Sequence, residues 1–372
     1  MIRMIGFELR KIFSQKMLWA GVVLLGALAY LVFSITFTNP RPDLTDEYAP
    51  YEGKVTDELI AKIKEDETTL RSQYGEEELF KLGKMSVFEQ FSWERSIQVN
   101  LEEEAKLLDF SIAKASGSEK ASLQLHKKML NEVNVDEFVY FNGPEEVVDY
   151  VNTFHFVFVA FLLLLGLSGV FSNDAQWKTE PILFSSRYGR SKHLNAKISA
   201  AILFTIIVVS ASEILNLTLR FLAYGTTGWE APVQAIFKYT TSPYAWTMGE
   251  YHLVQLGVSL LGALGLALVI LLISTLFPNT FLAFVVSSLL FGIPLILAEF
   301  IMVPEDSLAR LIQDYSFMTL LRVEELFMQF EAIVLFGQPI LTSIWIPAVV
   351  TAVSVIALAL LCLRVKRKQV HA

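Results

Sequence analysis

The chain has 372 residues, of which 53% are hydrophobic and only 18% are charged, and its formal net charge is −8. A soluble domain usually carries about 25% charged residues, so this composition argues against an ordinary soluble protein. The single cysteine, Cys362, excludes a disulfide within the chain. We interpret it as a small apolar residue that faces lipid or a neighbouring helix.

Residues 1–17 predict an amphipathic helix. Arg3, Arg10 and Lys11 occupy much of its polar side, and such a helix lies in the membrane interface before the chain turns into the first apolar run, 18–37. The alternative is a positively charged lead-in with no interfacial role. The apolar positions at helical spacing are Ile2, Ile5, Leu9, Ile12 and Phe13.

Residues 39–152 form the polar part of the chain, with 25 acidic and 13 basic residues. The segment opens with prolines that cannot continue a helix. Three stretches rich in helix formers follow, at 56–74, 85–115 and 118–133, and glycines separate them. We therefore expect a small helical lobe, or a long hairpin, on the outer surface of a membrane.

The rest of the chain is apolar and divides into further spans. From Leu253 to Ala298 there is no charged residue, and one helix of that length would extend about 69 Å, more than twice the roughly 30 Å core of a bilayer. Pro278 and Asn279 break this run into two. With the runs 18–37, 153–172, 198–222 and 340–363, the total is six spans. The loop 303–339 looks helical, and we expect it to pack against the lobe or to lie on the outer leaflet.

Basic residues predict the orientation. They cluster before the first span, between spans two and three, and after the last span, and with six spans these three segments share one side, the cytoplasm. The fold class is therefore all-α: a polytopic cell-membrane protein with six transmembrane helices, both termini in the cytoplasm, an N-terminal amphipathic helix and a helical extracellular domain at 39–152. Residues 153–372 hold spans two to six, with a cytoplasmic loop at 173–197.

No catalytic motif is visible in the sequence. There is no phosphate-binding loop, no His-Glu-x-x-His zinc helix and no Gly-x-Ser-x-Gly elbow. The five histidines are scattered, and we interpret His155 as a satisfied polar residue near the membrane interface. The chain is therefore expected to be no enzyme, and energy for any transport must come from another subunit.

The loop from Asp174 to Lys197 resembles the loop between spans two and three in the membrane subunits of type-2 ABC exporters. Thr179, Ser185, Arg190 and Lys197 stand at the family's motif positions, and Asp174 stands where Glu is usual. Two positions depart from the pattern, since Lys178 replaces a glycine and Arg187 a proline. Phe7, Glu8, Arg10 and Lys11 look like the family's elbow helix. The large insertion at 39–152 is not a general feature of the family.

The resemblance implies a mechanism and partners. A separate ABC ATPase subunit, which binds ATP and Mg²⁺, would dock on the cytoplasmic face, and a second permease, identical or related, would complete the pathway. Membrane lipid is the other partner; no cofactor in this chain and no nucleic acid are expected. The alternative is a basic loop that serves topology alone. The residues expected to couple to the ATPase are Asp174, Trp177, Thr179, Glu180, Phe184, Arg187, Arg190 and Lys197.

A few polar residues interrupt the spans. Glu213, Asn216 and Arg220 recur at i, i+3 and i+7 on one helix face, and an intramembrane carboxylate is costly unless it is paired or hydrated. We expect Glu213 to face the bundle interior or a partner subunit, and the long side chain of Arg220 can extend outward to the interface. With Glu299 late in the fifth span, these residues form either a translocation path or structural hydrogen bonds between helices.

Three classes of function remain open from the sequence. The first is an ATP-driven exporter subunit for a peptide, lipid or drug-like substrate. The second is a membrane-anchored sensing or binding subunit of an antimicrobial-peptide resistance complex, whose acidic outer domain attracts cationic ligands. An intramembrane enzyme is the third and least favoured class, because no histidine lies near Glu213 or Glu299 in the sequence.

Overall fold

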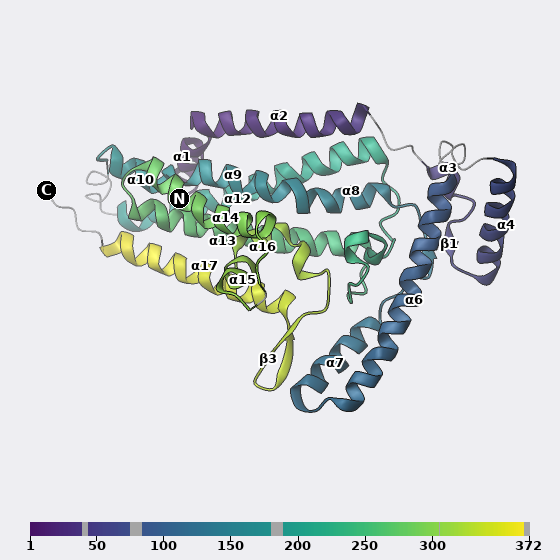
Figure 1. The fold of residues 1–372 in the computed structure, drawn as a ribbon. Coiled ribbons are helices and arrows are strands. Elements are labelled where there is room, and N and C mark those ends of the chain that lie inside the picture. Colours follow the sequence, from purple (N-terminus) through teal and green to yellow (C-terminus); the bar gives the residue numbers. More distant parts are fainter. Residues whose placement is uncertain (39–43, 75–83, 180–188, 305, 368–372) are drawn as a thin grey trace.

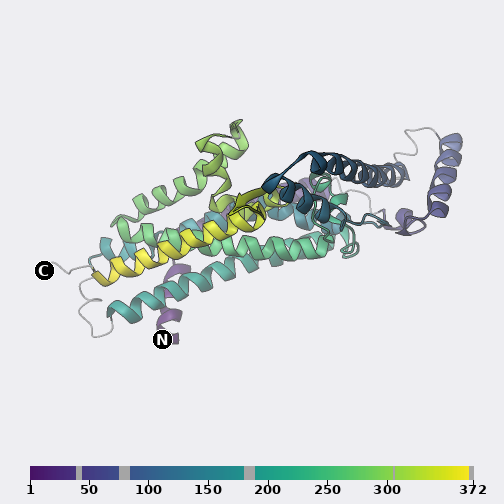
Figure 2. The same cartoon turned by 90° about the horizontal axis from the view of Figure 1, so that it is seen from below.

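The computed structural model describes the backbone of residues 1–38, 44–74, 84–179, 189–304 and 306–367, and side chains over the same ranges except 32–38, 84–85 and 189–190. Long helices run side by side in one bundle, and a smaller helical lobe stands at one end of it (Figure 1). The N-terminus and the end of the last described helix lie on the side of the bundle away from the lobe in both views (Figures 1 and 2). We call these the terminal end and the lobe end.

Five helical segments of the described chain are long and apolar enough to cross a membrane. The first helix, α1, meets α2 at a bend, and the two pass the same test only as a pair inclined by 59°. The six predicted spans therefore appear as five clear candidates and one bent pair. The five segments are Asn142–Gln176, Ser191–Tyr224, Met248–Leu276, Thr280–Phe300 and Thr342–Arg367.

The bundle helices follow the apolar runs but extend beyond them. The second span begins about ten residues earlier than predicted, because α8 continues through a π-helical turn, η1, into α9 and α10. The bundle elements are α1 (Ile2–Phe13), α2 (Lys16–Thr38), α8 (Asn142–Tyr150), η1 (Val151–His155), α9 (Phe156–Leu167), α10 (Gly169–Gln176), α12 (Gly189–Tyr224), α13 (Met248–Leu276), α14 (Thr280–Phe300) and α17 (Thr342–Arg367).

The helix α13 lies at the centre of the bundle and contacts α9, α12, α14 and α17. It begins with a capping box in which Thr247 and Glu250 bond each other's backbone N–H groups. The predicted break before α14 is confirmed, since the Asn279 side chain accepts hydrogen bonds from the first two N–H groups after Thr280. The helix carries one charged residue, Glu250 in its first turn, and half of its most apolar window is buried inside the chain.

A glycine allows α13 to approach the short helix α16 (Phe317–Arg322) closely. A Cβ at Gly262 would lie 2.7 Å from the Cβ of Leu320 and 3.1 Å from its backbone. We therefore expect Gly262→Ala to lower the free energy of unfolding by about 1–3 kcal/mol through overpacking. Gly257→Ala on the same helix is the matched control, because no atom lies within 4 Å of that Cβ; equal losses in thermal unfolding of the two variants would contradict this packing.

The lobe contains the three predicted helices. Thr56 caps the first by accepting a hydrogen bond from the Leu59 N–H, and the second and third form a hairpin. A two-stranded sheet, which the sequence did not predict, pairs Gly53 with Phe138 and closes the lobe core. The lobe elements are α3 (Thr45–Tyr48), β1 (Gly53–Lys54), α4 (Asp57–Gln73), α6 (Lys84–Lys114), α7 (Gly117–Leu130) and β2 (Glu137–Phe138).

Two ring stacks join the lobe to the bundle. Trp93 of α6 stacks on Phe237 with ring centroids 5.4 Å apart, and His126 of α7 stacks on Phe330 at 4.2 Å. Phe237 lies in a short element, η3, and Phe330 lies between two others, η4 and β3. The short elements outside the lobe are η2 (Val233–Ala235), η3 (Phe237–Tyr239), α15 (Leu308–Asp314), η4 (Glu324–Leu326), β3 (Ala332–Leu335) and β4 (Gln338–Leu341).

The loop 303–339 is only partly as predicted. It contains helices, and the β3–β4 hairpin contacts α7 of the lobe. However, Leu320 and Leu321 of α16 are completely buried in the bundle core, whereas Leu308 is 74% exposed. The loop therefore packs against the lobe through the hairpin and through Phe330 just before it, and not through the predicted apolar helical positions.

A buried carboxyl makes the stability of the lobe depend on pH. Burial raises the pKa of Glu94 from 4.5 to about 8, although a hydrogen bond from Gln90 at 2.9 Å opposes the shift. The folded state holds this proton more tightly than the unfolded state, so the proton stabilises the folded lobe. This stabilisation is complete below about pH 4.5 and is lost as pH rises toward 8, at about 1.4 kcal/mol per pH unit. Hydrogen exchange of α6 at pH 6 and 8.5 should show this loss. Glu94→Gln should remove this pH dependence, whereas Glu103→Gln, at an exposed position, should leave it unchanged.

Candidate functional site

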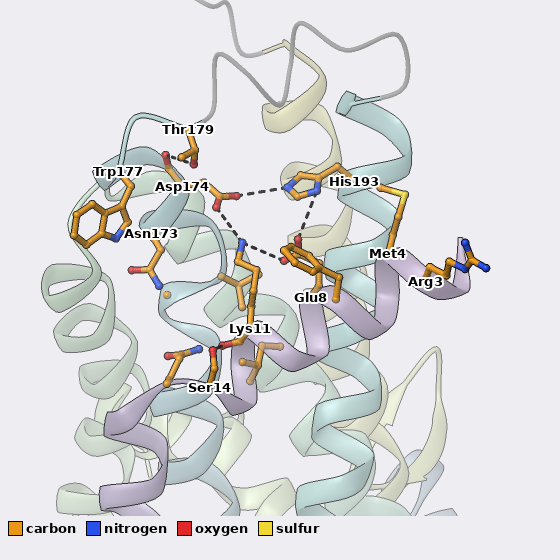
Figure 3. Close-up of a pocket in the computed structure, with 15 residues that line it drawn as sticks. Arg3, Met4, Glu8, Lys11, Ser14, Asn173, Asp174, Trp177, Thr179 and His193 are labelled. Carbon is orange, nitrogen blue, oxygen red and sulfur yellow. Dashed lines mark hydrogen bonds and ion pairs between the residues drawn. The ribbon is translucent and has the colours of Figure 1, made fainter.

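A pocket of about 1000 Å³ opens at the terminal end between α1, α10 and the start of α12. In Figure 3, side chains from these three helices point toward one another around it. Glu8 and Lys11 come from α1, Asp174 from α10 and His193 from α12. The pocket therefore lies where the predicted amphipathic helix meets both ends of the predicted coupling loop.

The helix α1 is amphipathic, as predicted, and packs across α12. Ile12 is buried, and the Phe13 ring meets the edge of Phe204 with centroids 5.4 Å apart. The chain after α1 is tied to the bundle, because Gln15 Nε2 donates to the Gly166 carbonyl at 2.8 Å. Thus α1 is held by apolar contacts on one side and by polar contacts at its end.

Charged side chains connect the three helices. Lys11 Nζ lies 3.3 Å from Asp174 Oδ1 and 3.6 Å from Glu8 Oε2. His193 lies between the same two carboxylates, 3.5 Å from Asp174 Oδ2 and 3.7 Å from Glu8 Oε1. Together with Lys197, these residues form what we call the junction cluster: Glu8, Lys11, Asp174, His193 and Lys197.

Lys197 is the most enclosed member of the junction cluster, with no exposed surface. Its ammonium donates to Asp174 Oδ2 and to the Val170 carbonyl, and it lies 4.5 Å from the centre of the Phe171 ring. A buried ammonium is tolerated only when it is paired and hydrogen-bonded. Asp174 therefore compensates Lys197, and the pair fixes α12 to α10.

The end of α10 holds Asp174 in place from its backbone as well. Thr179 N–H and Thr179 Oγ1 both donate to the Asp174 carbonyl, at 3.0 and 3.2 Å. Lys178 takes a φ of 54°, the left-handed conformation that ends many helices. Trp177, between them, is 74% exposed. The turn therefore presents an aromatic ring to the outside while it orients the carboxylate inward.

The structure brings several predicted residues into one site and separates others. Glu8, Lys11, Asp174 and Lys197 belong to the junction cluster; Phe7, Trp177 and Thr179 line the pocket beside it. Arg10 is exposed on α1. Arg190 is in the first turn of α12, but its side chain lies outside the described residues, as do Glu180, Phe184 and Arg187 altogether.

His193 was missed by the sequence reading. It stands four residues before Lys197, so both side chains lie on one face of α12. That spacing was the signal available in the sequence, but a single histidine in a basic loop does not by itself predict a functional site. Among the described residues, no group of three or more His, Cys, Asp or Glu side chains is placed to hold a metal ion.

A second polar cluster occupies the bundle interior near the lobe end. Glu213 faces the bundle interior, one of the two predicted surroundings, and lies 2.9 Å from His252 Nε2 of α13. Asn216 donates to the Val147 carbonyl at 3.1 Å and approaches Glu213 Oε2 at 3.4 Å. These contacts join α12 to α13 and α8. The histidine was missed because it is 39 positions from Glu213 in the sequence.

Two other polar residues of the spans have an ion-pair partner within the chain. Arg220 is 8% exposed and pairs with Glu146 of α8 at 2.7 Å. Glu299 lies apart from the Glu213 cluster and pairs with Arg322 of α16 at 2.5 Å, and its side chain is 40% exposed. The translocation path stays a prediction. His155 is fully buried and only partly satisfied: its Nδ1 contacts Ser212 Oγ at 2.9 Å, but its Nε2 has no hydrogen-bond partner among the described residues.

Comparisons with known proteins give no family for this chain. No protein-family model, no curated protein and no solved structure matches it.

Proposed function

We propose that this chain is the permease subunit of an ATP-binding-cassette exporter. In this proposal the bent α1–α2 pair supplies the first of six spans, the terminal end faces the cytoplasm, and a separate subunit binds ATP and Mg²⁺. The observation that carries the proposal is the junction cluster, which joins the N-terminal amphipathic helix to both ends of the loop 173–197.

The physical reasoning concerns how a push on that loop would reach the bundle. The loop is flanked by α10 and α12, and the Asp174–Lys197 pair holds these two helices together at its base. Lys11 and Glu8 add α1 to the same cluster. A force on the loop would therefore move three helices as one unit, and the exposed Trp177 supplies an apolar contact for the subunit that applies it.

A second permease would complete the pathway. Only 22% of α14 and 28% of α17 is buried within the chain over their most apolar windows, so both helices leave apolar faces uncovered. Lipid covers such faces in a monomer, and a second permease would cover part of them in a complex. The substrate class stays as predicted: a peptide, a lipid or a drug-like molecule.

A sensing role for the lobe is the second candidate. The two ring stacks, Trp93–Phe237 and His126–Phe330, are a specific contact through which the acidic lobe could act on the bundle. Deletion of residues 45–145 separates the two roles. Lost response to a cationic peptide with retained ATPase stimulation would favour sensing, and lost assembly would favour a structural lobe.

The proposal is tested by purifying the chain from its native membrane in mild detergent. We expect a nucleotide-binding subunit to co-purify, and its ATPase activity to depend on this chain. Arg190→Glu in the loop should reduce that activity. A clean chain with no such partner, together with an unaffected Arg190→Glu variant, would overturn the proposal.

A further inference from the structure

Side chains from η1, α12 and α13 form one continuous hydrogen-bond chain inside the bundle. Glu213 contacts His252, whose Nδ1 lies 3.2 Å from Gln255 Oε1. Gln255 Nε2 in turn lies 2.8 Å from Asn152 Oδ1. All these residues are buried, with Gln255 fully enclosed. This hydrogen-bond chain is separate from the proposed coupling site, which lies at the other end of the bundle.

The orientation of the Gln255 amide is fixed by a backbone group. Its nitrogen lies 3.2 Å from the Val148 carbonyl as well as 2.8 Å from Asn152 Oδ1. A carbonyl oxygen can only accept a hydrogen bond, so the atom facing it must be the NH₂ group. The amide oxygen of Gln255 therefore faces His252.

The fixed amide determines the tautomer of His252. Since Gln255 Oε1 can only accept, His252 Nδ1 must carry a proton and donate it. A neutral imidazole with Nδ1 protonated has a lone pair on Nε2, which would face Glu213 Oε1 at 2.9 Å. A lone pair against an ionised carboxylate is repulsive, so one more proton must lie between these two atoms.

We propose that Glu213 and His252 form a buried proton-binding site that holds one proton shared between Oε1 and Nε2. The proton is on the imidazole of an ion pair or on the carboxyl of a neutral pair, and the net charge is zero in both cases. The side chains are 11% and 7% exposed, which suits a site that exchanges protons slowly with the lobe end.

Other charged and titratable groups surround the pair. The salt bridge between Glu146 of α8 and Arg220 of α12 lies one to two turns away and is neutral overall. From α8 and η1 come Tyr150 and His155, which both contact Ser212 Oγ. Tyr239 of η3 donates to or accepts from Tyr251 of α13 at 2.7 Å, next to His252. Lys238, the residue before Tyr239, forms ion pairs with Asp149 and Glu324.

The site joins two helices that would have to separate in any opening of the bundle here. If α12 moves away from α13, the shared proton must stay on one partner or leave, so the opening is linked to proton binding. The inference concerns a single chain and does not rest on the proposed ATPase partner. Its tests therefore use the purified full-length chain alone, and their failure would leave the coupling proposal untouched.

Nitrogen NMR on the ¹⁵N-histidine-labelled chain in nanodiscs tests the protonation state, with His252→Gln assigning the signal among five histidines. We expect Nδ1 of His252 to be protonated at pH 7.5. We also expect either an imidazolium or, in infrared spectra, a protonated carboxyl band that Glu213→Gln removes. In Glu213→Gln, His252 should stay in the neutral Nδ1–H tautomer as pH changes. A neutral Nε2–H tautomer, or an Nδ1–H tautomer beside an ionised Glu213, would overturn the proposal.

Thermal unfolding tests the link to helix packing. The unfolded imidazole releases its proton above its ordinary pKa of about 6.5, whereas the proposed folded pair keeps one, so the unfolding temperature of the wild-type chain should fall by about 2 °C or more per pH unit above that pH. The Glu213→Gln/His252→Gln chain can keep a hydrogen bond without titrating, so this part of the pH dependence should be absent from it. Identical pH profiles for the two proteins would overturn the link.

Discussion

Asp174→Asn should lower the free energy of unfolding by about 3–5 kcal/mol, the usual cost of removing one partner from a buried ion pair. The reason is Lys197, whose ammonium is fully enclosed and has Asp174 as its charged partner at the shortest separation in the junction cluster. Without the carboxylate, a positive charge stays buried beside the Val170 carbonyl. Chemical unfolding of the purified chain in detergent measures the change.

A double-mutant cycle isolates the pair from other effects. Lys197→Met removes the buried charge, so Asp174→Asn/Lys197→Met should recover a large part of the loss seen in Asp174→Asn. Asp109→Asn is the matched control, since Asp109 pairs with Lys127 at the lobe surface with 62% of its side chain exposed, and the cost there should stay below about 1 kcal/mol. Equal effects of Asp174→Asn and Asp109→Asn would show that the junction cluster does not hold the helices together.

Trp177→Ala should weaken binding of the proposed ATPase subunit by about 30-fold, or roughly 2 kcal/mol, without changing the stability of the chain. The ring is 74% exposed at the pocket edge, so its removal costs the fold little. Exposed tryptophans at an interface centre often contribute this much to binding. The affinity between purified subunits, measured by surface-based or fluorescence titration, gives the comparison.

Phe336→Ala is the control for that experiment. Phe336 is fully exposed at the tip of the β3–β4 hairpin, which contacts α7 of the lobe, so its loss should leave ATPase binding unchanged. If both variants bind as tightly as the wild type, the docking surface does not include the end of α10. If both weaken equally, the aromatic effect is nonspecific.

Much of the architecture could be predicted because it depends on local patterns. Helical periodicity between glycines located α4, α6 and α7 to within a few residues, and the charge-free run with Pro278 and Asn279 located the α13–α14 break. The β1–β2 pair was not predictable from its two-residue strands, which carry no alternation. The early start of the second span was missed because α8 is polar on one side and becomes buried only through tertiary packing.

The candidate sites divide in the same way. Asp174 and Lys197 were predicted through the resemblance of their loop to a known family, and Glu8 and Lys11 through the resemblance of the N-terminal helix to that family's elbow helix. His193 and His252 were missed because each pairs with a carboxylate that is distant in the sequence. Glu299 was grouped with Glu213 on residue type alone, and only the packing of α16 against α14 gives it its own partner, Arg322.

The central claim is that the junction cluster faces the cytoplasm, where an ATPase could reach it. Cysteine labelling in intact cells tests this directly, in a chain whose one native cysteine is removed by Cys362→Ser. A membrane-impermeant maleimide should label the Phe336→Cys variant in intact cells and the Trp177→Cys variant only after permeabilisation. Labelling of Trp177→Cys from outside intact cells would put the junction cluster on the wrong side of the membrane and contradict the account.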